Sequence, residues 1–440
     1  MIKVCKFGGT SMANADAMQQ VKKIILSDPD RKYVVVSAPG KRNKEDIKIT
    51  DTLYACYDEV VTTGKCDKHF AFIRERFTSI VAELGLKLDI KSILDKTEAE
   101  IIANKSADFS ASRGEYLSAI VVAEYLGYEF VDASDMVRFE SSGRLNEEYT
   151  DDKVKTRLKD VEKAVIPGFY GKDYEGKIKT FSRGGSDITG SIIARGVKAD
   201  LYENWTDVSG FLICDPRIVP EAKAIKQITY KELRELSYMG ASVLHSEAIF
   251  PVKKAKIPIV IKNTFKPEDP GTLIVPNEQY TLAENNDVIT GIAGKKNFIV
   301  IVLEKSMMNS EIGFIRRVLS VLEHHGLTVE HLPSGIDTLS VIISSEQLKS
   351  GDLYDIVNEI RENVSPDFVH VIENISIIAT VGHGMTRRQG TAATIFNALA
   401  EAGINIVMID QGSSELNIIV GVENADYEKC IRTIYKAFVK

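Results

Sequence analysis

Strand-like and helix-like segments alternate over residues 1–295 of the 440-residue chain, and this alternation constrains its fold more than any other feature. The run YVVVSA at Tyr33–Ala38 is a continuous β-branched segment, as expected of a strand buried on both faces. Apolar residues recur at helical spacing over Met12–Leu26. Such alternation predicts a domain at 1–295 with an α/β fold, in which a mostly parallel sheet is sandwiched by helices. Further helices are predicted at Asp51–Thr63, Asp67–Leu84, Asp89–Asn104, Ser112–Leu126, Ser186–Arg195 and Lys231–Met239, and further strands at Lys3–Lys6, Glu129–Asp132, Ile178–Phe181, Leu201–Asn204 and Pro258–Lys262.

The remaining C-terminal part of the chain contains an internal repeat. A strand, a loop, a helix and a second strand occur twice, with Gly313 and Gly390 before the two helices and Gly326 and Gly403 after them. Both pairs of glycines are 77 residues apart, from 313 to 390 and from 326 to 403. Each copy continues into another strand, and we expect a helix and a further strand to complete it. The repeat predicts two α+β domains, at 296–370 and 371–440, with a strand at 288–294 completing the second. Strands are predicted at Phe298–Glu304, Leu327–His331 and Thr338–Ile343, and again at Ser376–Gly382, Ile404–Ile409 and Glu415–Val422.

Composition and charge argue against several classes of protein. The formal net charge is −7 and there is no basic block, so a nucleic-acid partner is not expected. No apolar run reaches the ~18 residues of a membrane span, and the N-terminus lacks the apolar segment of a signal peptide. The five cysteines form no C-x-x-C pair and the seven histidines show no metal-ligand spacing, so no dedicated metal site is expected. These features favour a protein of the reducing cytoplasm with no membrane partner.

A glycine turn follows the first predicted strand and reads Lys6-Phe7-Gly8-Gly9-Thr10-Ser11. Two adjacent glycines let backbone N–H groups approach a phosphate closely, and a helix that starts at Ser11 would add its positive N-terminal end. Lys6, at the end of the strand, can put an ammonium group beside a phosphoryl group in transfer. The alternative is a tight turn in which Ser11 serves only as the helix N-cap. Both interpretations remain open from the sequence.

A second glycine turn, SRGGSD at Ser182–Asp187, also follows a strand and opens a helix. Two helix N-termini aimed at one place could hold a phosphoryl donor and an anionic acceptor. Arg183 suits a carboxylate because its guanidinium forms paired hydrogen bonds. The alternative role of Asp187 is that of a first-turn acid that offsets the helix dipole.

Three further segments carry clusters of polar residues. The segment SRGE at Ser112–Glu115 opens a predicted helix and places Glu115 in its first turn. The segment WTDVSG at Trp205–Gly210 ends a strand and continues to Asp215–Arg217. Loop and cap chemistry is the alternative for both. The charged stretch Lys41–Lys48 is interpreted as a solvated surface loop or as a mobile lid near a phosphate site.

Together these motifs resemble those of the aspartokinases. KFGGTS, SRGE, SRGGSD and WTDVSG…DPR occur in that family's order, and the C-terminal repeat resembles its paired ACT domains, with QGSSE at Gln411–Glu415 as a specific match. The sequence has no P-loop, no protein-kinase motif set and no dinucleotide fingerprint. The resemblance implies the amino-acid kinase fold plus two ACT domains, and transfer of the γ-phosphoryl group of ATP to the β-carboxylate of aspartate in lysine, threonine and methionine biosynthesis. A kinase for a glutamate-type substrate and a non-catalytic amino-acid sensor are the alternatives.

The resemblance also implies roles for individual residues. Lys6 and Asp187 would be catalytic, with Asp187 organising Lys6 and the substrate rather than acting as a base. Mg²⁺ is expected to arrive with ATP, because no carboxylate cluster is dedicated to it. Ser242 and Leu212 stand where many relatives carry a lysine and a tyrosine, so those nucleotide contacts cannot be carried over. ATP would be bound by Lys6, Phe7, Gly8, Gly9, Ser11, Thr206, Asp207 and Arg217, and aspartate by Ser37, Thr50, Glu115, Arg183, Gly184 and Ser186.

The paired ACT domains imply feedback inhibition by an amino acid, with lysine favoured and threonine second or synergistic. The pocket is predicted where the loop before Gly313 faces the strand around Glu330. A helix N-terminus there would hold the effector's α-carboxylate, and Glu330 would hold the ε-ammonium of lysine unless it is a solvated strand residue. An ACT sheet exposes an edge strand, so we expect a homodimer built through these domains, which could pair again into a tetramer. The predicted pocket residues are Met308, Ser310, Glu311, Gly313, Val329 and Glu330.

Overall fold

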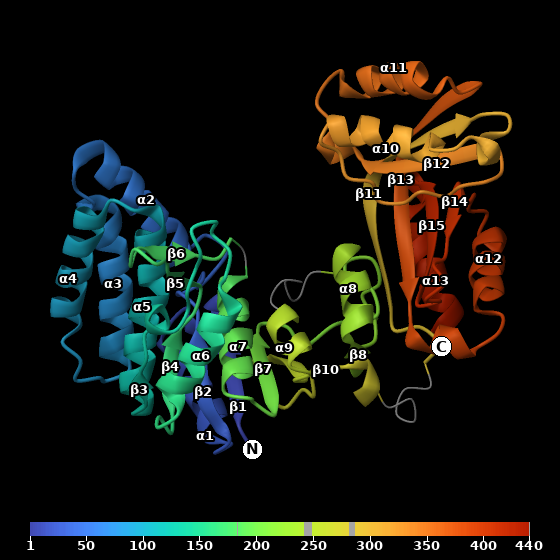
Figure 1. Cartoon of the computed structure of the whole chain (residues 1–440). Coiled ribbons are helices and arrows are strands. Elements are labelled where there is room, and N and C mark those ends of the chain that lie inside the picture. Colours follow the sequence, from blue (N-terminus) through green and yellow to red (C-terminus); the bar gives the residue numbers. More distant parts are fainter. Residues whose placement is uncertain (183, 242–248, 281–286, 440) are drawn as a thin grey trace. The chain divides into compact units, whose positions relative to one another are not determined.

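The computed structural model describes residues 1–182, 184–241, 249–280 and 287–439, and the chain forms two compact units (Figure 1). The first unit contains Met1–Phe211, Ala224–Leu233 and Ser242–Tyr280, and the second contains Leu212–Lys223, Arg234–Ala241 and Thr281–Lys440. Each unit has its own sheet and its own buried apolar core. No described helix is both long enough and apolar enough to cross a membrane.

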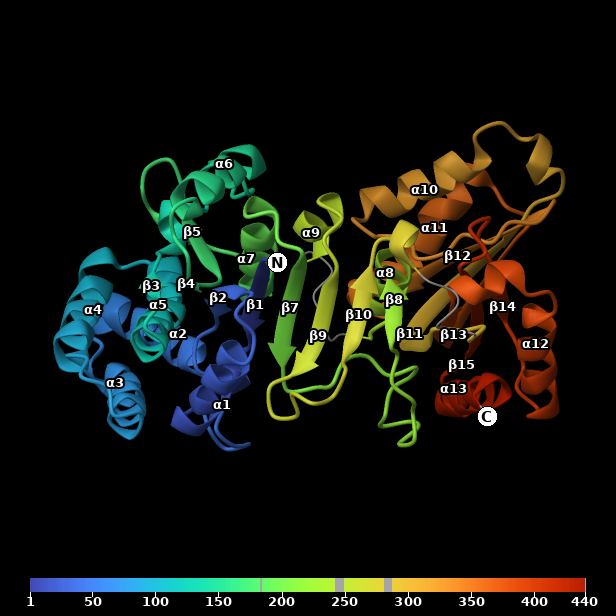
Figure 2. The ribbon, with the colours of Figure 1, turned by 90° about the horizontal axis from the view of Figure 1, so that it is seen from below.

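The first unit is built on a sheet with the strand order β3-β4-β2-β1-β7-β9-β10-β8. Neighbouring strands are parallel except β9 and β10, so the predicted mostly parallel sheet is confirmed. Figure 2 shows β1, β7, β9 and β10 side by side. The strands are β1 (Lys3–Phe7), β2 (Arg31–Val36), β3 (Glu129–Phe130), β4 (Ala164–Pro167), β7 (Leu201–Thr206), β8 (Gln227–Thr229), β9 (Ile259–Asn263) and β10 (Thr272–Val275).

Helices of the first unit bury their apolar faces in a core shared with this sheet. Met18, Val21 and Ile24 of α1, whose spacing predicts the helix, join Val34 and Val36 of β2 in one cluster. The helices are α1 (Ala15–Leu26), α2 (Ile49–Thr63), α3 (Asp67–Glu83), α4 (Ile90–Asn104), α5 (Ala107–Leu126), α6 (Glu147–Leu158), α7 (Gly185–Gly196), α9 (Phe250–Lys254) and α8 (Tyr230–Tyr238), whose residues from Arg234 on belong to the second unit. Of these elements, the sequence patterns above do not predict α6, α9, β4, β8 and β10.

The helix that carries SRGE begins earlier than predicted. Ser106 caps it by accepting a hydrogen bond from the backbone N–H of Phe109, and α5 therefore starts at Ala107. Glu115 lies well inside the helix and not in its first turn. The prediction is wrong because Ser106, and not Ser112, satisfies the first free N–H groups of the helix.

Two predicted strands pair otherwise than expected, and a third, predicted at Ile404–Ile409, forms only as β14 (Met408–Asp410). The segment predicted at Ile178–Phe181 forms β6 (Ile178–Thr180), which pairs with β5 (Tyr170–Lys172) in a separate two-stranded sheet and not with the main sheet. In the second unit, the strand predicted at Leu327–His331 is reduced to a single bridge between His331 and Ile342. Both segments have strand-like composition, but pairing depends on distant partners that a local pattern does not contain.

The second unit is an antiparallel sheet with the order β12-β11-β13-β15-β14, on which α10 packs with α11 and α12 packs with α13. The strand predicted at 288–294 is the beginning of β11, which starts at Gly291 and continues to Glu304. β11 and β13 pair along most of their length and so contribute to both copies of the repeat. The elements are β11 (Gly291–Glu304), α10 (Phe314–His324), β12 (Thr338–Ser344), α11 (Asp352–Val364), β13 (Phe368–Val381), α12 (Thr391–Glu401), β14 (Met408–Asp410), β15 (Asn417–Glu423) and α13 (Tyr427–Phe438).

The repeat glycines lie at helix ends, as predicted. Gly313 and Gly390 precede α10 and α12 with φ values of +80° and +86°. Gly326 and Gly403 follow the same helices with φ values of +69° and +64°. All four adopt the left-handed conformation that other residues reach only with strain, which explains why they mark the register of the repeat.

Candidate functional site

A cavity of about 230 Å³ lies in the first unit, where the ends of β1 and β2 meet the beginning of α7. Most of the residues predicted to be catalytic or to bind aspartate line it. Phe169, which follows β4 and has a φ of +78°, also lines the cavity but carries no local sequence signal of a site. The lining residues are Lys6, Ser37, Thr50, Glu115, Phe169, Gly184, Gly185, Ser186 and Asp187.

Lys6 and Asp187 form an ion pair in the wall of this cavity. The distance from Lys6 Nζ to Asp187 Oδ1 is 2.6 Å, and Asn204 Nδ2 donates a hydrogen bond of 2.7 Å to the same oxygen. Lys6 on β1 and Asn204 on β7 are partners in neighbouring strands, while Asp187 lies in the first turn of α7. The structure thus brings the two predicted catalytic residues together and adds Asn204, which the sequence motifs do not include.

The first glycine turn differs from its prediction in where the helix begins. Gly9–Met12 forms a 3-10 helix, and α1 starts only at Ala15 because the Asn14 side chain caps it there. Ser11 is therefore neither the start nor the cap of α1; it is buried, and its hydroxyl lies 2.8 Å from Thr264 Oγ1. A Cβ on Gly9 would come within 3.1 Å of the Ala38 carbonyl oxygen, so glycine allows the turn to pack against the segment after β2.

The second glycine turn opens α7 at the cavity, as predicted. Gly184 precedes the helix with a left-handed φ of +59°. A Cβ on Gly185 would lie 2.5 Å from the Phe169 ring, and one on Gly168 would lie 2.7 Å from Ser186 Cβ. These glycines therefore allow the beginning of α7 to approach the segment after β4, with the first N–H groups of the helix available to an anion. Arg183 lies outside the described residues.

Glu115 reaches the cavity from the interior of α5. It is 5% exposed, and its Oε2 has no hydrogen-bond partner in the described part of the chain. Burial raises the pKa of Glu115 to about 8, although a backbone hydrogen bond from Ala38 and the charges of Arg113 and Lys6 act in the opposite direction. Gly114 allows this approach, because a Cβ there would lie 2.6 Å from Ala38 Cβ. Oε2 is therefore available to a cationic group of a ligand, which would favour the ionised form of Glu115.

Two of the residues predicted to bind ATP lie at the end of β7. Thr206 is its last residue, and Asp207 is exposed immediately after it. Asn263 Nδ2 donates a hydrogen bond of 3.3 Å to the Asp207 carbonyl oxygen, which ties this turn to the end of β9. Phe7 is fully buried and stacks on Trp205 with ring centroids 5.9 Å apart, so only its backbone is available to a ligand.

Two of the remaining positions discussed for the nucleotide belong to the second unit. Arg217 belongs to the second unit, where its side chain is 89% exposed and pairs with Asp215 at 2.6 Å. Leu212 belongs to the same unit, and Ser242 lies outside the described residues.

The charged loop Lys41–Lys48 is anchored by a buried ion pair. Asp46 accepts hydrogen bonds of 2.9 and 2.7 Å from the Arg76 guanidinium, which is 1% exposed. Arg76 also donates to the Gly40 carbonyl oxygen at 3.1 Å, next to the first glycine turn. Burial would raise the pKa of Asp46, but hydrogen bonds from Arg42 and the charge of Arg76 outweigh it and hold this pKa well below its usual range. One end of the loop is thus fixed, whichever of its two predicted roles it has.

We expect Asp46→Asn to destabilise the first unit by roughly 3–5 kcal/mol, because it leaves a buried guanidinium without its carboxylate. Since the pKa of Asp46 is depressed in the folded chain, its stabilisation is present above the unfolded pKa of ~3.9 and is lost as the pH falls towards the folded value. Thermal unfolding between pH 7 and pH 3 measures both effects. Glu45→Gln, at an exposed position in the same loop, is the control and should leave the transition unchanged. Equal transitions for Asp46→Asn and wild type at pH 7 would show that the pair contributes nothing.

The loop predicted to bind an effector lies in the second unit and faces residues that the prediction did not name. The backbone N–H of Met307 donates to Asp337 Oδ1 at 2.8 Å, and that of Asn309 donates to the Ile336 carbonyl oxygen at 3.2 Å. Met308 is buried in the core of this unit, against which Val329 also packs. No hydrogen bond of the described residues joins the loop to Glu330. The remaining predicted residues are Ser310, which hydrogen-bonds Asn309, Glu311, which pairs with Lys305 and Arg317, and Gly313, which precedes α10.

Glu330 has a partner on α8. The Tyr238 hydroxyl donates a hydrogen bond to Glu330 Oε2. Burial and this carboxylate raise the pKa of Tyr238 to about 12, so the hydroxyl stays protonated and remains a donor at neutral pH. Lys295 Nζ lies 5.0 Å from the centre of the Tyr238 ring. Glu330 is therefore not merely a solvated residue but an acceptor within a small polar cluster of Tyr238, Glu330 and Lys295.

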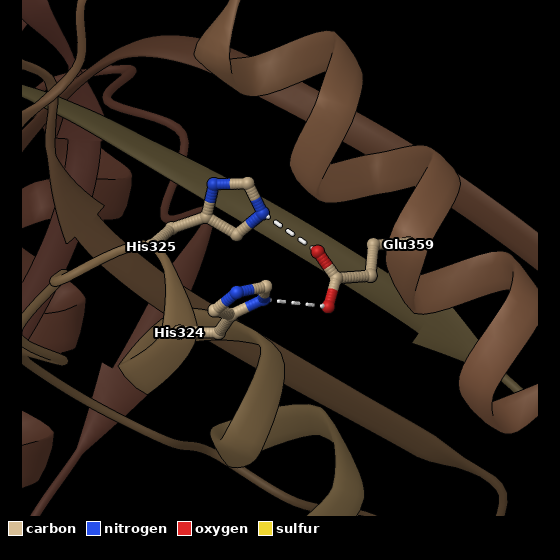
Figure 3. Close-up of side chains that lie close together, drawn as sticks. All are labelled: His324, His325 and Glu359. Carbon is tan, nitrogen blue, oxygen red and sulfur yellow. Dashed lines mark hydrogen bonds and ion pairs between the residues drawn. The ribbon is translucent and has the colours of Figure 1, made fainter.

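One group of potential metal ligands occurs among the described residues, and it lies in the second unit. Figure 3 shows His324 and His325, at the end of α10, facing the carboxylate of Glu359 on α11. His324 Nδ1 is 3.2 Å from Oε1 and His325 Nε2 is 2.8 Å from Oε2, and these hydrogen bonds lower the pKa of Glu359. The histidine spacing alone does not reveal the group, because Glu359 comes from a different helix. In the cavity, Asp187 pairs with Lys6 and Glu115 is buried. That Mg²⁺ arrives with ATP stays a prediction.

Comparison with known proteins finds relatives along the whole chain. Residues 1–263 match the amino acid kinase family, and residues 378–438 match an ACT domain. The chain is 39% identical to aspartokinase 3 of Bacillus subtilis (strain 168), over 99% of this chain and 98% of that protein. The crystal structure of Clostridium acetobutylicum aspartate kinase is 52% identical, with a TM-score of 0.91 and 99% of both chains covered. Two structures of E. coli aspartokinase III, one in complex with aspartate and ADP and one in complex with lysine and aspartate, are each 25% identical over 100% of both chains, with TM-scores of 0.75 and 0.72.

Proposed function

The chain belongs to the aspartokinases, ATP-dependent kinases of the amino acid kinase family, and we propose that it transfers the γ-phosphoryl group of ATP to the β-carboxylate of L-aspartate. The observation that carries this proposal is one cavity lined by both the Lys6 ammonium and the carboxyl group of Glu115, whose Oε2 has no partner among the described residues. The ammonium suits an anionic phosphoryl group, and the carboxylate suits the α-ammonium of an amino acid. The product would be β-aspartyl phosphate, at the first step of lysine, threonine and methionine biosynthesis.

Binding of aspartate would use both charged groups on its α-carbon. Glu115 would pair with the α-ammonium, and Arg183, by the sequence prediction, would bind the α-carboxylate. Ser37, Thr50, Gly184 and Ser186 supply further polar groups around the substrate. The complex of E. coli aspartokinase III with aspartate and ADP supports these two ligands for the present chain. ATP would approach the first glycine turn and the end of β7, with Gly8, Gly9, Thr206 and Asp207 as contacts.

The chemistry requires positive charge rather than a base. The β-carboxylate of aspartate has an ordinary pKa of ~3.9 and is already ionised at pH 7. The difficulty is to bring this anion to another anion and to stabilise charge on the transferring group. Lys6 and the first N–H groups of α7 supply positive charge. Asp187 orients Lys6, because its Oδ1 forms an ion pair with the Lys6 ammonium. Mg²⁺ carried by ATP would offset charge on the phosphates.

A coupled assay of ADP release tests the proposal. Aspartate should support turnover, and hydroxylamine should trap the acyl phosphate as a hydroxamate. Glutamate and N-acetylglutamate are the control substrates, and preference for either would favour the glutamate-type alternative. Absence of ADP formation with all three substrates would favour the non-catalytic sensor.

Inhibition by lysine, alone or with threonine, is the regulatory part of the proposal. The complex of E. coli aspartokinase III with lysine and aspartate supports lysine as a ligand of such chains. A lysine ε-ammonium that binds Glu330 at Oε2 would compete with the Tyr238 hydroxyl for that oxygen. We also propose that two chains associate through their ACT domains, because β14 is an edge strand of the sheet. A monomer in light scattering would contradict that association.

We expect Tyr238→Phe to lower the lysine concentration needed for half inhibition by about 3- to 10-fold, since an exposed hydrogen bond of ~1 kcal/mol no longer competes for Glu330. Glu330→Ala should raise that concentration and leave the uninhibited kcat nearly intact. Tyr354→Phe, which removes an exposed hydroxyl from α11, is the matched control and should change nothing. Inhibition curves at saturating ATP measure all three variants. If Glu330→Ala retains wild-type sensitivity, lysine does not bind at this carboxylate.

A further inference from the structure

Asn204 is a polar residue in the middle of a buried strand. It is 3% exposed. Successive side chains of β7 point to opposite faces of the sheet. Glu203 faces one side, where it accepts hydrogen bonds of 2.8 Å from both Arg31 and Trp205 Nε1. Asn204 faces the other side, towards α7, where its amide reaches Asp187. A buried amide needs a partner, but an apolar residue would fill this position without that need.

The partner of this amide is the oxygen that also binds Lys6. Asn204 Nδ2 lies 2.7 Å and Lys6 Nζ 2.6 Å from Asp187 Oδ1. A carboxylate has two oxygens, and a single flexible ammonium can pair with either of them. A second donor, fixed on a neighbouring strand, selects one oxygen and one orientation. Because the amide is neutral, it adds this constraint without changing the charge of the Lys6–Asp187 pair.

β7 also fixes the backbone of Asp187. Tyr202, two positions before Asn204 and on the same face, donates a hydrogen bond of 3.1 Å from its hydroxyl to the Asp187 carbonyl oxygen. Gly190 leaves room for this tyrosine, because a Cβ there would lie 2.5 Å from Tyr202 Oη. One strand therefore fixes both the carbonyl group and the carboxylate of Asp187. This double attachment orients the first turn of α7 at the cavity.

We propose that Asn204 is a positioning residue for phosphoryl transfer: it holds Asp187 so that Lys6 presents its ammonium to the transferring group in one fixed direction. The inference rests on the proposed function, in which Lys6 stabilises that group. Asn204 itself does not line the cavity. Its removal should therefore affect the chemical step more than the binding of aspartate or ATP.

Asn204→Leu removes the amide at similar volume. We expect kcat to fall about 10-fold or more, while KM for aspartate and for ATP stay within about 3-fold of wild type. Tyr202→Phe is the comparison variant, because it removes the hydroxyl that holds the Asp187 carbonyl oxygen and leaves the Asn204 amide in place. It should lower the thermal transition as much as Asn204→Leu does, or more, with a smaller loss of kcat. A kcat for Asn204→Leu within 2-fold of wild type would overturn the proposal.

Asn204→Asp gives a readout that a structural role would not produce. It places a second carboxylate beside Asp187, and two carboxylates so close share a proton. The protonated form can donate as the amide does, whereas loss of that proton draws Lys6 between two negative charges. We expect kcat of this variant to fall with rising pH over a range in which wild-type kcat is constant. A wild-type pH profile would overturn the proposal.

A crystal structure of Asn204→Leu separates this inference from the proposed function. The Asp187 carboxylate should rotate away from its wild-type orientation and take Lys6 Nζ with it. An unchanged carboxylate, with Lys6 still 2.6 Å from Oδ1, would overturn the positioning role whether or not the enzyme acts on aspartate. Wild-type protein that releases no ADP with aspartate would instead refute the proposed function, and the crystal structure would still decide the role of Asn204.

Discussion

Lys6→Ala should lower kcat by about 100-fold or more and leave aspartate binding nearly unchanged, because it removes a charge that acts mainly in the transition state. The ammonium lines the cavity, is almost fully buried and is held by Asp187 at 2.6 Å, so no solvent cation can take its place at little cost. Aspartate binding depends on other groups of the cavity. Steady-state kinetics for kcat and calorimetry for aspartate binding separate the two effects.

The control for this variant is Lys3→Ala. Lys3 lies at the opposite end of β1 and pairs with Asp28 at 2.6 Å, so its loss removes the same kind of charge at a distance from the cavity and should preserve kcat. The double variant Lys6→Ala/Asp187→Asn adds a sharper test. Lys6→Ala alone leaves Asp187 as an unpaired negative charge near the phosphoryl group, so the double variant should be no worse than the single one. An unchanged kcat for a folded Lys6→Ala variant would remove Lys6 from the mechanism.

Both glycine turns could be predicted from the sequence, but the reason that they meet could not. Lys6 lies near the end of β1 in the main sheet, whereas the strand before the second turn is β6, which belongs to the separate two-stranded sheet. Asp187 in the first turn of α7 reaches Lys6 because α7 packs against β1 and β2. Local patterns predict that each turn precedes a helix, but they do not contain this packing.

Other parts of the site depend on contacts that local patterns do not contain. Glu115 reaches the cavity only because α5 starts at Ala107 and Gly114 lets the helix approach Ala38. Phe169 carries no motif. Asn204 does carry a weak signal, since a polar residue in a strand buried on both faces needs a partner, but the sequence cannot name Asp187 as that partner. Long-range pairing also decides that Ile178–Thr180 joins a separate small sheet.

Glu115→Gln should raise KM for aspartate by about 30-fold or more, because a buried charge that loses its partner costs roughly 2–5 kcal/mol of binding. In the proposed complex that charge is the α-ammonium of the substrate. Glu115 is the carboxylate of the cavity that lacks a partner on Oε2, whereas Asp187 is already paired with Lys6. The kcat should change less than KM, since the α-ammonium does not react.

The pH dependence of aspartate binding gives this prediction a second readout. Because burial raises the pKa of Glu115 to about 8, the empty site is mostly protonated at pH 7, and binding of an ammonium requires that the proton leave. Aspartate binding should therefore release up to about one proton per site, and affinity should increase as the pH rises from 6 to 8. Calorimetry at pH 7 in buffers of different ionisation enthalpy measures the released protons.

The Glu115 carboxyl group should also make the stability of the unliganded protein depend on pH. Its folded pKa lies above the unfolded value of ~4.3, so its contribution to stability is fully present below pH ~4.3 and is lost as the pH rises through about 8. Glutamine has nearly the shape of glutamate but does not titrate. The thermal transition temperature of Glu115→Gln should therefore decrease less between pH 6 and pH 9 than that of wild type. Glu100→Gln, near the end of α4 and outside the cavity, controls for the loss of one carboxylate.

If wild type and Glu115→Gln release the same number of protons on binding aspartate, Glu115 does not receive the substrate's ammonium.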